Sequence, residues 1–151
     1  MTDFLLDSNV FDELLDGAIP SDLVKRCGRV FVTNVQISEL KNVPDRTRRS
    51  KLLALLDDLA PEKLHLHSGV WLDDLYWDDD QPWRDEIGPD CEHFVKGKTN
   101  LPWKDALIGE VAKHRGLTLV SKDRIFLRRA AAAQIPTMEA AEFISLARSN
   151  A

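Results

Sequence analysis

Short apolar runs alternate with stretches of helical periodicity along this chain of 151 residues. Three of the runs, Phe4–Leu6, Val30–Val32 and Leu117–Val120, lead into helix-like segments. An apolar run bounded by capping or turn residues is typical of a strand. Strands that alternate with helices predict a three-layer α/β/α sandwich around a mostly parallel central sheet. Such a sheet binds its ligands outside the carboxyl ends of its strands.

Capping and turn residues divide the chain further. Expected strands cover residues 3–7, 29–33, 64–66, 117–121 and 135–138. Expected helices cover residues 9–16, 21–27, a short segment that ends before Pro44, 46–59, 103–115, 124–133 and 139–148. Ser21 is the expected N-cap of the second helix, and Thr33 or Asn34 that of the third. Residues 69–77 fit a helix, whereas residues 78–102 fit a loop or a small irregular insertion.

The composition, with 44% apolar and 30% charged residues, is that of a globular protein. One domain should span residues 1–151, with an acidic, Trp-containing insertion at about 71–100. No apolar stretch approaches the ~20 residues that span a bilayer, and no basic segment precedes the first apolar run. Cys27 and Cys91 indicate no disulfide framework. We therefore expect a cytoplasmic protein without a membrane segment.

The net charge of −5 is unevenly distributed. The stretch Asp73–Glu92 holds nine acidic residues and one basic residue, so its local charge is −8 and the rest of the chain carries +3. Overall acidity therefore does not exclude an RNA partner, although it lends that idea no support.

Four acidic residues are candidates for a functional site: Asp7, Glu39, Asp105 and Asp123. Asp7 and Asp123 follow the first and third apolar runs, Glu39 lies after the second run, and Asp105 opens a helical pattern. In a parallel sheet at least three of these acids would gather at one edge. Carboxylates gathered in this way hold divalent metal for chemistry on phosphates.

Each acid also has a purely structural explanation. Asp7 and Asp123 precede helices, where a side-chain oxygen caps free backbone N–H groups. Asp105 lies in a first helical turn, where the macrodipole favours a negative charge, and Glu39 could be a solvated helix residue. Capping and solvation alone could therefore account for all four acids.

Small polar residues accompany the acids that end strands. Ser8 and Asn9 follow Asp7, and Ser121 lies two residues before Asp123. Such groups can donate hydrogen bonds to carboxylates and fix their orientation, as a metal site requires. This pattern favours one shared pocket over separate helix caps.

Four blocks of sequence match one family in their order and spacing. They are Leu5–Val10, Ser38–Leu40, Lys104–Ile108 and Leu119–Phe126. Together they resemble the PIN-domain family over essentially the whole chain, and in particular its compact members, the VapC-type toxins of toxin–antitoxin pairs. The resemblance implies a doubly wound α/β/α fold and a metal-dependent ribonuclease directed at single strands. Ser8 and Ser121 stand where the family more often has threonine, and Leu127 stands where some members carry a fifth acid.

The resemblance also implies roles for the acids. Asp7, Asp105 and Asp123 would bind one or two Mg²⁺ or Mn²⁺ ions, directly or through water. Glu39 would be a further ligand or would orient the attacking water. The residues expected to support these carboxylates are Ser8, Asn9 and Ser121. The candidate phosphate contacts are Lys104, Lys122 and Arg124.

The leading hypothesis is an endoribonuclease that serves as the toxin of a pair and is neutralised by a cognate antitoxin. Its expected partners are an RNA substrate, the antitoxin and a second copy of the chain in a homodimer. The alternatives are an RNA-processing PIN nuclease without toxin function and a non-catalytic PIN-like module that binds protein. All four acids are present, which disfavours the non-catalytic module.

Overall fold

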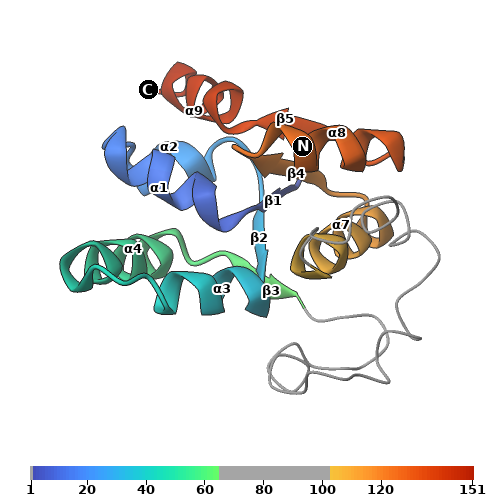
Figure 1. The fold of residues 1–151 in the computed structure, drawn as a ribbon. Helices are drawn as coiled ribbons and strands as arrows, with labels where there is room; N and C mark the ends of the chain where they lie inside the picture. The colour runs from blue at the N-terminus through green and yellow to red at the C-terminus, as the bar shows by residue number, and fades with distance from the viewer. Residues whose placement is uncertain (1, 65–102) are drawn as a thin grey trace.

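The computed structural model of the chain describes residues 2–64 and 103–151, with the backbone alone for residues 103–107. The acidic insertion expected at about 71–100 therefore lies outside the described residues, as do the helix expected at 69–77 and the loop expected at 78–102. The described part forms a three-layer α/β/α arrangement (Figure 1).

A five-stranded parallel sheet forms the middle layer of the described structure. Its strands are β1 (Phe4–Leu6), β2 (Val30–Thr33), β3 (Glu62–Leu64), β4 (Thr118–Ser121) and β5 (Thr137–Glu139). The order across the sheet is β3-β2-β1-β4-β5. The prediction of a parallel α/β sandwich is confirmed.

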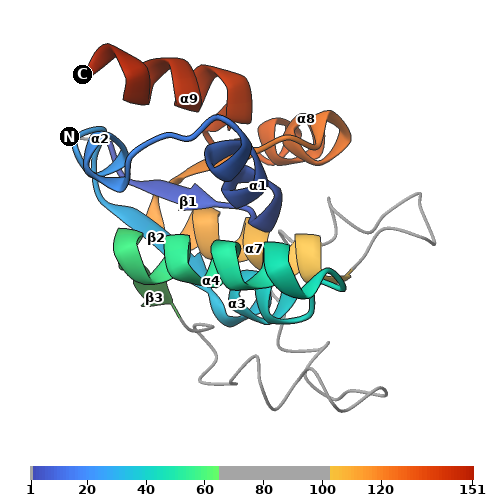
Figure 2. The same cartoon turned by 90° about the vertical axis from the view of Figure 1, so that its left-hand side faces the viewer.

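Helices cover both faces of this sheet. They are α1 (Ser8–Asp16), α2 (Ser21–Lys25), α3 (Asn34–Lys41), α4 (Arg46–Leu59), α7 (Trp103–Arg115), α8 (Arg124–Ala132) and α9 (Ala140–Ser149). Successive strand residues point to opposite faces. Leu5 and Leu119 accordingly join the core beneath α7 and α8, whereas Leu6 and Val120 join the core beneath α1, α4 and α9. Figures 1 and 2 show α7 on one side of the sheet and α1 and α4 on the other.

The chain reverses its direction of travel across the sheet between β1 and β4. From β1 it moves outward to β2 and β3, and it then returns to the other side of β1 to form β4 and β5. Leu6 pairs with Val120, and the N–H of Asp7 donates to the carbonyl oxygen of Val120 at 2.9 Å. The ends of β1 and β4 therefore lie side by side at a topological switch point, where parallel sheets bind ligands.

Several predicted boundaries differ from those of the structure. The N-cap of α2 is Pro20, whose carbonyl accepts the first helical N–H groups, so Ser21 already lies within the helix. The helix ends at Lys25 rather than at residue 27. The strand expected to begin at residue 64 already begins at Glu62, because Glu62–Leu64 pairs with Phe31–Thr33 of β2, and its expected residues 65 and 66 lie outside the described residues. By contrast, α4 and α7 have the predicted bounds.

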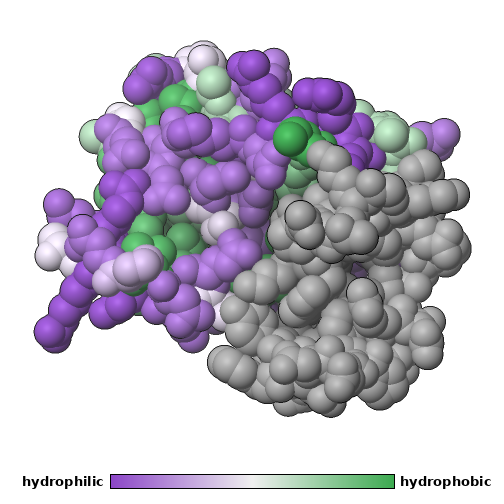
Figure 3. Space-filling view, in the orientation of Figure 1, coloured by the Kyte–Doolittle hydropathy of each residue, from purple (hydrophilic) through white to green (hydrophobic). Residues whose placement is uncertain are grey.

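The described surface carries few large apolar side chains. Only Ile125 and Leu146 are exposed among the described large hydrophobic residues. Figure 3 shows hydrophilic residues over most of the described surface on this face, with hydrophobic residues in small scattered spots. None of the described helices combines the length and apolar character that would let it cross a membrane.

The packing of α9 on the sheet can be tested with two residues of the same helix. Phe143 is fully buried and meets Phe4 edge to face at 5.1 Å between ring centroids. Phe143→Ala should therefore lower the free energy of unfolding by about 3–5 kcal/mol. Leu146→Ala, which removes a side chain 36% exposed, should cost less than about 1 kcal/mol. Urea denaturation of the two variants measures the difference, and equal losses would contradict the described packing of α9.

Candidate functional site

Asp7 occupies the junction between β1 and α1, and its carboxylate is buried. As the N-cap of α1, it accepts a hydrogen bond on Oδ1 from the backbone N–H of Ser8 at 2.9 Å. Its other oxygen, Oδ2, accepts a hydrogen bond from the Ser121 hydroxyl at 2.8 Å. One carboxylate thus links the ends of the two strands that flank the switch point.

Ser121 is the centre of a network that joins α1 to the turn after β4. Its Oγ donates to Asp7 and accepts from Asn9 Nδ2 at 3.3 Å and from the N–H of Asp123 at 3.1 Å. One hydroxyl has one hydrogen and two lone pairs, so these bonds use its full capacity. Asn9 Oδ1 in turn accepts from the N–H of Lys122 at 3.0 Å. The polar residues that accompany the acids in the sequence are therefore in contact with them in the structure.

Glu39 reaches the same region from α3. The helix begins where β2 ends, because Thr33 caps it and Gln36 Oε1 accepts from the N–H of Thr33 at 2.7 Å. Glu39 Oε2 accepts a hydrogen bond from the hydroxyl of Ser8. Ser8 therefore donates to two acids, with its N–H to Asp7 and its hydroxyl to Glu39.

Asp123 caps α8 and is more exposed than Asp7. Its Oδ1 accepts from the N–H groups of Ile125 at 3.0 Å and Phe126 at 3.1 Å. Both capping bonds go to one oxygen, so Oδ2 lies outside the cap. The capping explanation is therefore correct for both Asp7 and Asp123. In Asp123, however, the cap uses only Oδ1, and Oδ2 makes no capping bond.

The three described acids share one electrostatic environment. The pKa of Asp7 is raised to about 6 in all, because burial and, to a lesser extent, the charges of Glu39 and Asp123 outweigh the hydrogen bonds from Ser121 and Ser8, which lower it. None of the main causes of this shift is a cation of the described residues. The ionised Asp7 carboxylate is therefore poorly compensated in the protein alone, and a nearby divalent cation would favour its charged form.

The fourth acid, Asp105, lies in the first turn of α7, and its side chain is outside the described residues, like that of Lys104. Within residues 2–64 and the described side chains from 108 onward, no three His, Cys, Asp or Glu residues form a group that could hold a metal ion. The chemical type of the donors nonetheless suits a hard divalent cation, because Asp7, Glu39 and Asp123 all supply carboxylate oxygens and the charges of the last two act on the buried Asp7. The assignment of these acids and Asp105 to a metal site remains a prediction.

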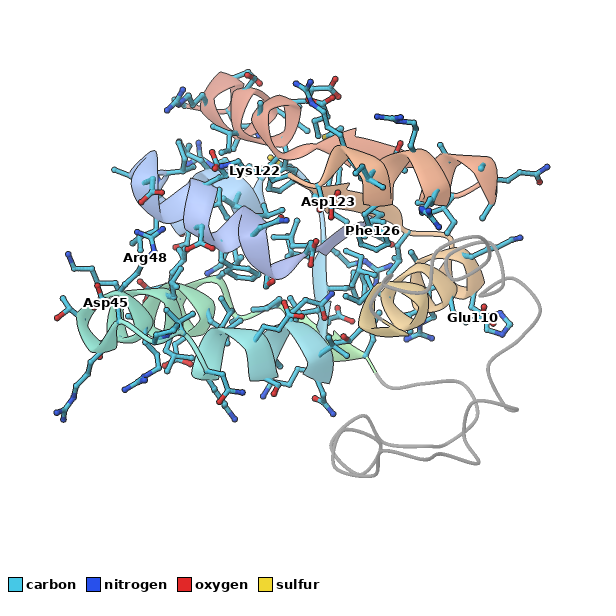
Figure 4. The ribbon with its side chains drawn as sticks, in the orientation of Figure 1. Asp45, Arg48, Glu110, Lys122, Asp123 and Phe126 are labelled. Atoms are coloured by element: carbon cyan, nitrogen blue, oxygen red, sulfur yellow. The ribbon has the colours of Figure 1, made fainter. Side chains whose placement is uncertain are left out.

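Two of the candidate phosphate contacts are engaged with acids of their own chain. Lys122 Nζ lies 2.6 Å from Glu13 Oε1, and Arg124 Nε lies 3.7 Å from Glu139 Oε1. Figure 4 shows Lys122 and Asp123 next to each other where α1 and α8 approach. Sequence reasoning missed Glu13, although it stands four residues after Asn9 and therefore on the same face of α1.

The PIN domain family profile matches residues 4–132 of the chain. PAE2754 from Pyrobaculum aerophilum is a similar solved structure, with 18% identity, 97% of this chain and 98% of that chain covered, and a TM-score of 0.59. FitAcB from Neisseria gonorrhoeae has 15% identity, covers 91% of this chain and 97% of its own, and gives a TM-score of 0.55. No curated protein sequence matches this chain. At these identities the solved structures bear on the fold alone.

The raised pKa of Asp7 predicts how the stability of the metal-free protein depends on pH. A buried carboxyl with a pKa of about 6, against an ordinary value of 3.8, stabilises the fold while it is protonated, and this contribution is lost as the pH rises through 6. Asp7→Asn should therefore raise the free energy of unfolding at pH 7.5 by about 1–3 kcal/mol, with no gain below pH 4. Thermal unfolding in excess chelator between pH 4 and pH 8 measures the difference.

Asp3→Asn provides a control of opposite sign. Arg29 donates a hydrogen bond to Asp3 and holds the pKa of that carboxyl below its usual range. The ionised Asp3 stabilises the fold above its ordinary pKa, so its replacement should slightly lower the melting temperature at pH 7.5. A loss of stability in Asp7→Asn at pH 7.5 would show that the burial of its charge carries no cost.

Proposed function

The chain belongs to the PIN domain family, and on that basis we propose that it is a metal-dependent endoribonuclease that cleaves phosphodiester bonds of RNA. PIN domains are generally metal-dependent nucleases. The observation that carries the proposal is the buried Asp7 carboxylate, which has a raised pKa and lies at the switch point beside Glu39 and Asp123. A stable fold gains nothing from an uncompensated charge in that place, whereas a metal site requires one.

The proposed metal chemistry gives each residue of the site a specific role. One or two Mg²⁺ or Mn²⁺ ions would neutralise the scissile phosphate and lower the pKa of a bound water. Asp7, Asp105 and Asp123 would hold the metal, and Glu39 would be a further ligand or would orient the attacking water. The described hydrogen bonds give the supporting residues their task, because Ser121 orients Asp7, Ser8 orients both Asp7 and Glu39, and Asn9 orients Ser121.

Lys104 and Arg124 are the cations that we retain as contacts for the RNA backbone. Arg124 is 77% exposed and only loosely paired, since 3.7 Å separates its Nε from Glu139 Oε1. An exposed pair of this kind exchanges readily for a phosphate. Lys122 is held much more closely by Glu13, at 2.6 Å.

Replacement of single acids by asparagine separates capping from metal binding. Asparagine caps a helix about as well as aspartate, but it supplies no negative charge. Asp7→Asn and Asp123→Asn should each lower kcat/KM for RNA cleavage by at least about 100-fold, because several kcal/mol of charge stabilisation are lost. The measurement is cleavage of a mixed RNA pool with Mg²⁺ or Mn²⁺, followed by mapping of the cut sites.

Asp45→Asn is the matched control. Asp45 caps α4 through bonds from the N–H groups of Thr47 at 2.9 Å and Arg48 at 3.2 Å. Figure 4 shows it well apart from Asp123. This variant should keep its activity within about twofold, since Asn preserves the cap. Cleavage that persists in Asp7→Asn, or in the wild type with excess chelator, would contradict the proposed metal chemistry.

We further propose that this nuclease is the toxin of a toxin–antitoxin pair and acts in the cytoplasm as a homodimer. The support is the resemblance of its four sequence blocks to VapC-type toxins. The cognate antitoxin would cover the acidic site and would place a basic side chain among the carboxylates, which would block metal and substrate together.

Expression of the chain alone should therefore arrest bacterial growth, and Asp7→Asn should abolish the arrest. Co-expression of the product of an adjacent short reading frame should restore growth and give a complex in which RNA cleavage is lost. Colony counts and size-exclusion chromatography are the measurements. Unimpaired growth with an active enzyme would instead favour an RNA-processing nuclease.

A further inference from the structure

Lys122 lies between two residues of the proposed site, Ser121 and Asp123, and it bonds to α1 twice. Its N–H donates to Asn9 Oδ1 at 3.0 Å, and its Nζ lies 2.6 Å from Glu13 Oε1. Asn9 and Glu13 are one helical turn apart on α1. Through these two contacts, Lys122 links the turn after β4 to one face of α1.

A second cation, Arg48, forms ion pairs with α1 on its other side. Arg48 of α4 donates to Asp12 at 2.8 and 3.0 Å and to Asp16 at 3.0 and 3.2 Å. Figure 4 shows Arg48 between α1 and α4, on the opposite side of α1 from Lys122. The helix that Asp7 caps is thus held by ion pairs on both sides, two to Arg48 of α4 and one to Lys122 in the turn that carries Asp123.

We propose that Lys122 is a positioning residue, whose ion pair with Glu13 fixes the spacing between the carboxylates of Asp7 and Asp123. This inference rests on the proposed metal-dependent function. The two carboxylates belong to different elements, since Asp7 is the N-cap of α1 and Asp123 is the N-cap of α8. The described contacts from the Asp123 side to α1 run through Ser121 and Lys122.

The exposure of the pair determines what its loss should change. The Lys122 side chain is 66% exposed and that of Glu13 is 32% exposed, so the pair adds little to global stability. Metal affinity and catalysis respond far more strongly to the placement of ligands than folding stability does. A positioning role therefore predicts a small change in melting temperature together with a large change in metal affinity.

The competing explanation is that Lys122 binds an RNA phosphate directly. Glu13 would then compete with the RNA, and Glu13→Gln would release Lys122 and lower KM. A purely long-range charge effect gives a third pattern, because Glu13→Gln would weaken metal binding and Lys122→Gln would strengthen it. Only a positioning role makes both variants weaken metal binding.

The experiment compares Glu13→Gln, Lys122→Gln and the exchanged pair Glu13→Lys with Lys122→Glu. Each single variant should lower Mn²⁺ affinity, measured by calorimetry without RNA, by about tenfold and should lower kcat by a similar factor. KM for RNA should change less than about twofold, and the exchanged pair should recover to within about threefold of the wild type. A decrease in KM in Glu13→Gln, or an increase in Mn²⁺ affinity in Lys122→Gln, would overturn the proposal.

Asp3→Asn is the matched control, because Asp3 and Arg29 form an ion pair of 2.7 Å next to the amino ends of β1 and β2. This variant should leave Mn²⁺ affinity and kcat unchanged. An equal loss in this control would assign the effect to general destabilisation and would also overturn the proposal.

Amide hydrogen exchange of the metal-free protein tests the same contact without any activity. Glu13→Gln should reduce the protection of the Lys122 and Asp123 amides by about tenfold and leave the amides of β1 unchanged. A wild type that neither binds Mn²⁺ nor cleaves RNA would refute the proposed nuclease function, and the exchange result would still test the role of Lys122. Unchanged protection of both amides in Glu13→Gln would overturn the positioning proposal itself.

Discussion

Burial of the Asp7 carboxylate is the constraint on which the rest of the site depends. A charged carboxylate that leaves water needs hydrogen bonds and a compensating charge. The fold supplies the hydrogen bonds through the Ser8 N–H and the Ser121 hydroxyl, but burial still raises the pKa of Asp7 to about 6. The arrangement of β1 and β4 therefore brings together carboxylates that repel one another, and in the proposed function a cation would offset that repulsion. In physical terms, the buried Asp7 carboxylate lowers the stability of the protein alone when it is ionised.

Local chemistry explains why much of this structure can be read from the sequence. Asp45 caps α4 through neighbouring N–H groups, and Ala60 closes the helix in a left-handed conformation, so both ends depend on nearby residues. In the same way, Asp7 directly follows one apolar run and Asp123 lies three residues after another. Because these runs form parallel strands, the place of both acids at one edge of the sheet follows from the strand direction alone. Predictions of this kind need no knowledge of tertiary contacts.

Contacts between distant parts of the chain explain what the sequence could not reveal. The edge strand β3 contains the exposed residues Glu62 and Lys63, and only its pairing with β2 makes it a strand. Lys122 was predicted to contact phosphate because it is next to Asp123 in the sequence. That contact stays a prediction, and in the described structure the side chain is paired with Glu13, which precedes it by more than a hundred residues. The sequence shows which groups are near an acid along the chain, but the direction of a long flexible side chain depends on packing.

Helix capping by these acids is compatible with the metal binding that we propose for them. Asp7 uses Oδ1 for its cap and Oδ2 for Ser121, and Asp123 uses Oδ1 alone to cap α8. The same geometry directs the positive amino ends of α1 and α8 toward the edge of the sheet where the strands end, with α3 starting after the neighbouring β2. These helix ends partly offset the repulsion among the carboxylates, and they also favour an approaching anion such as a phosphate. In the proposed function, the junction between strand and helix would therefore provide the cap, the metal ligand and the attraction for substrate, and few residues beyond the caps would be needed to build the site.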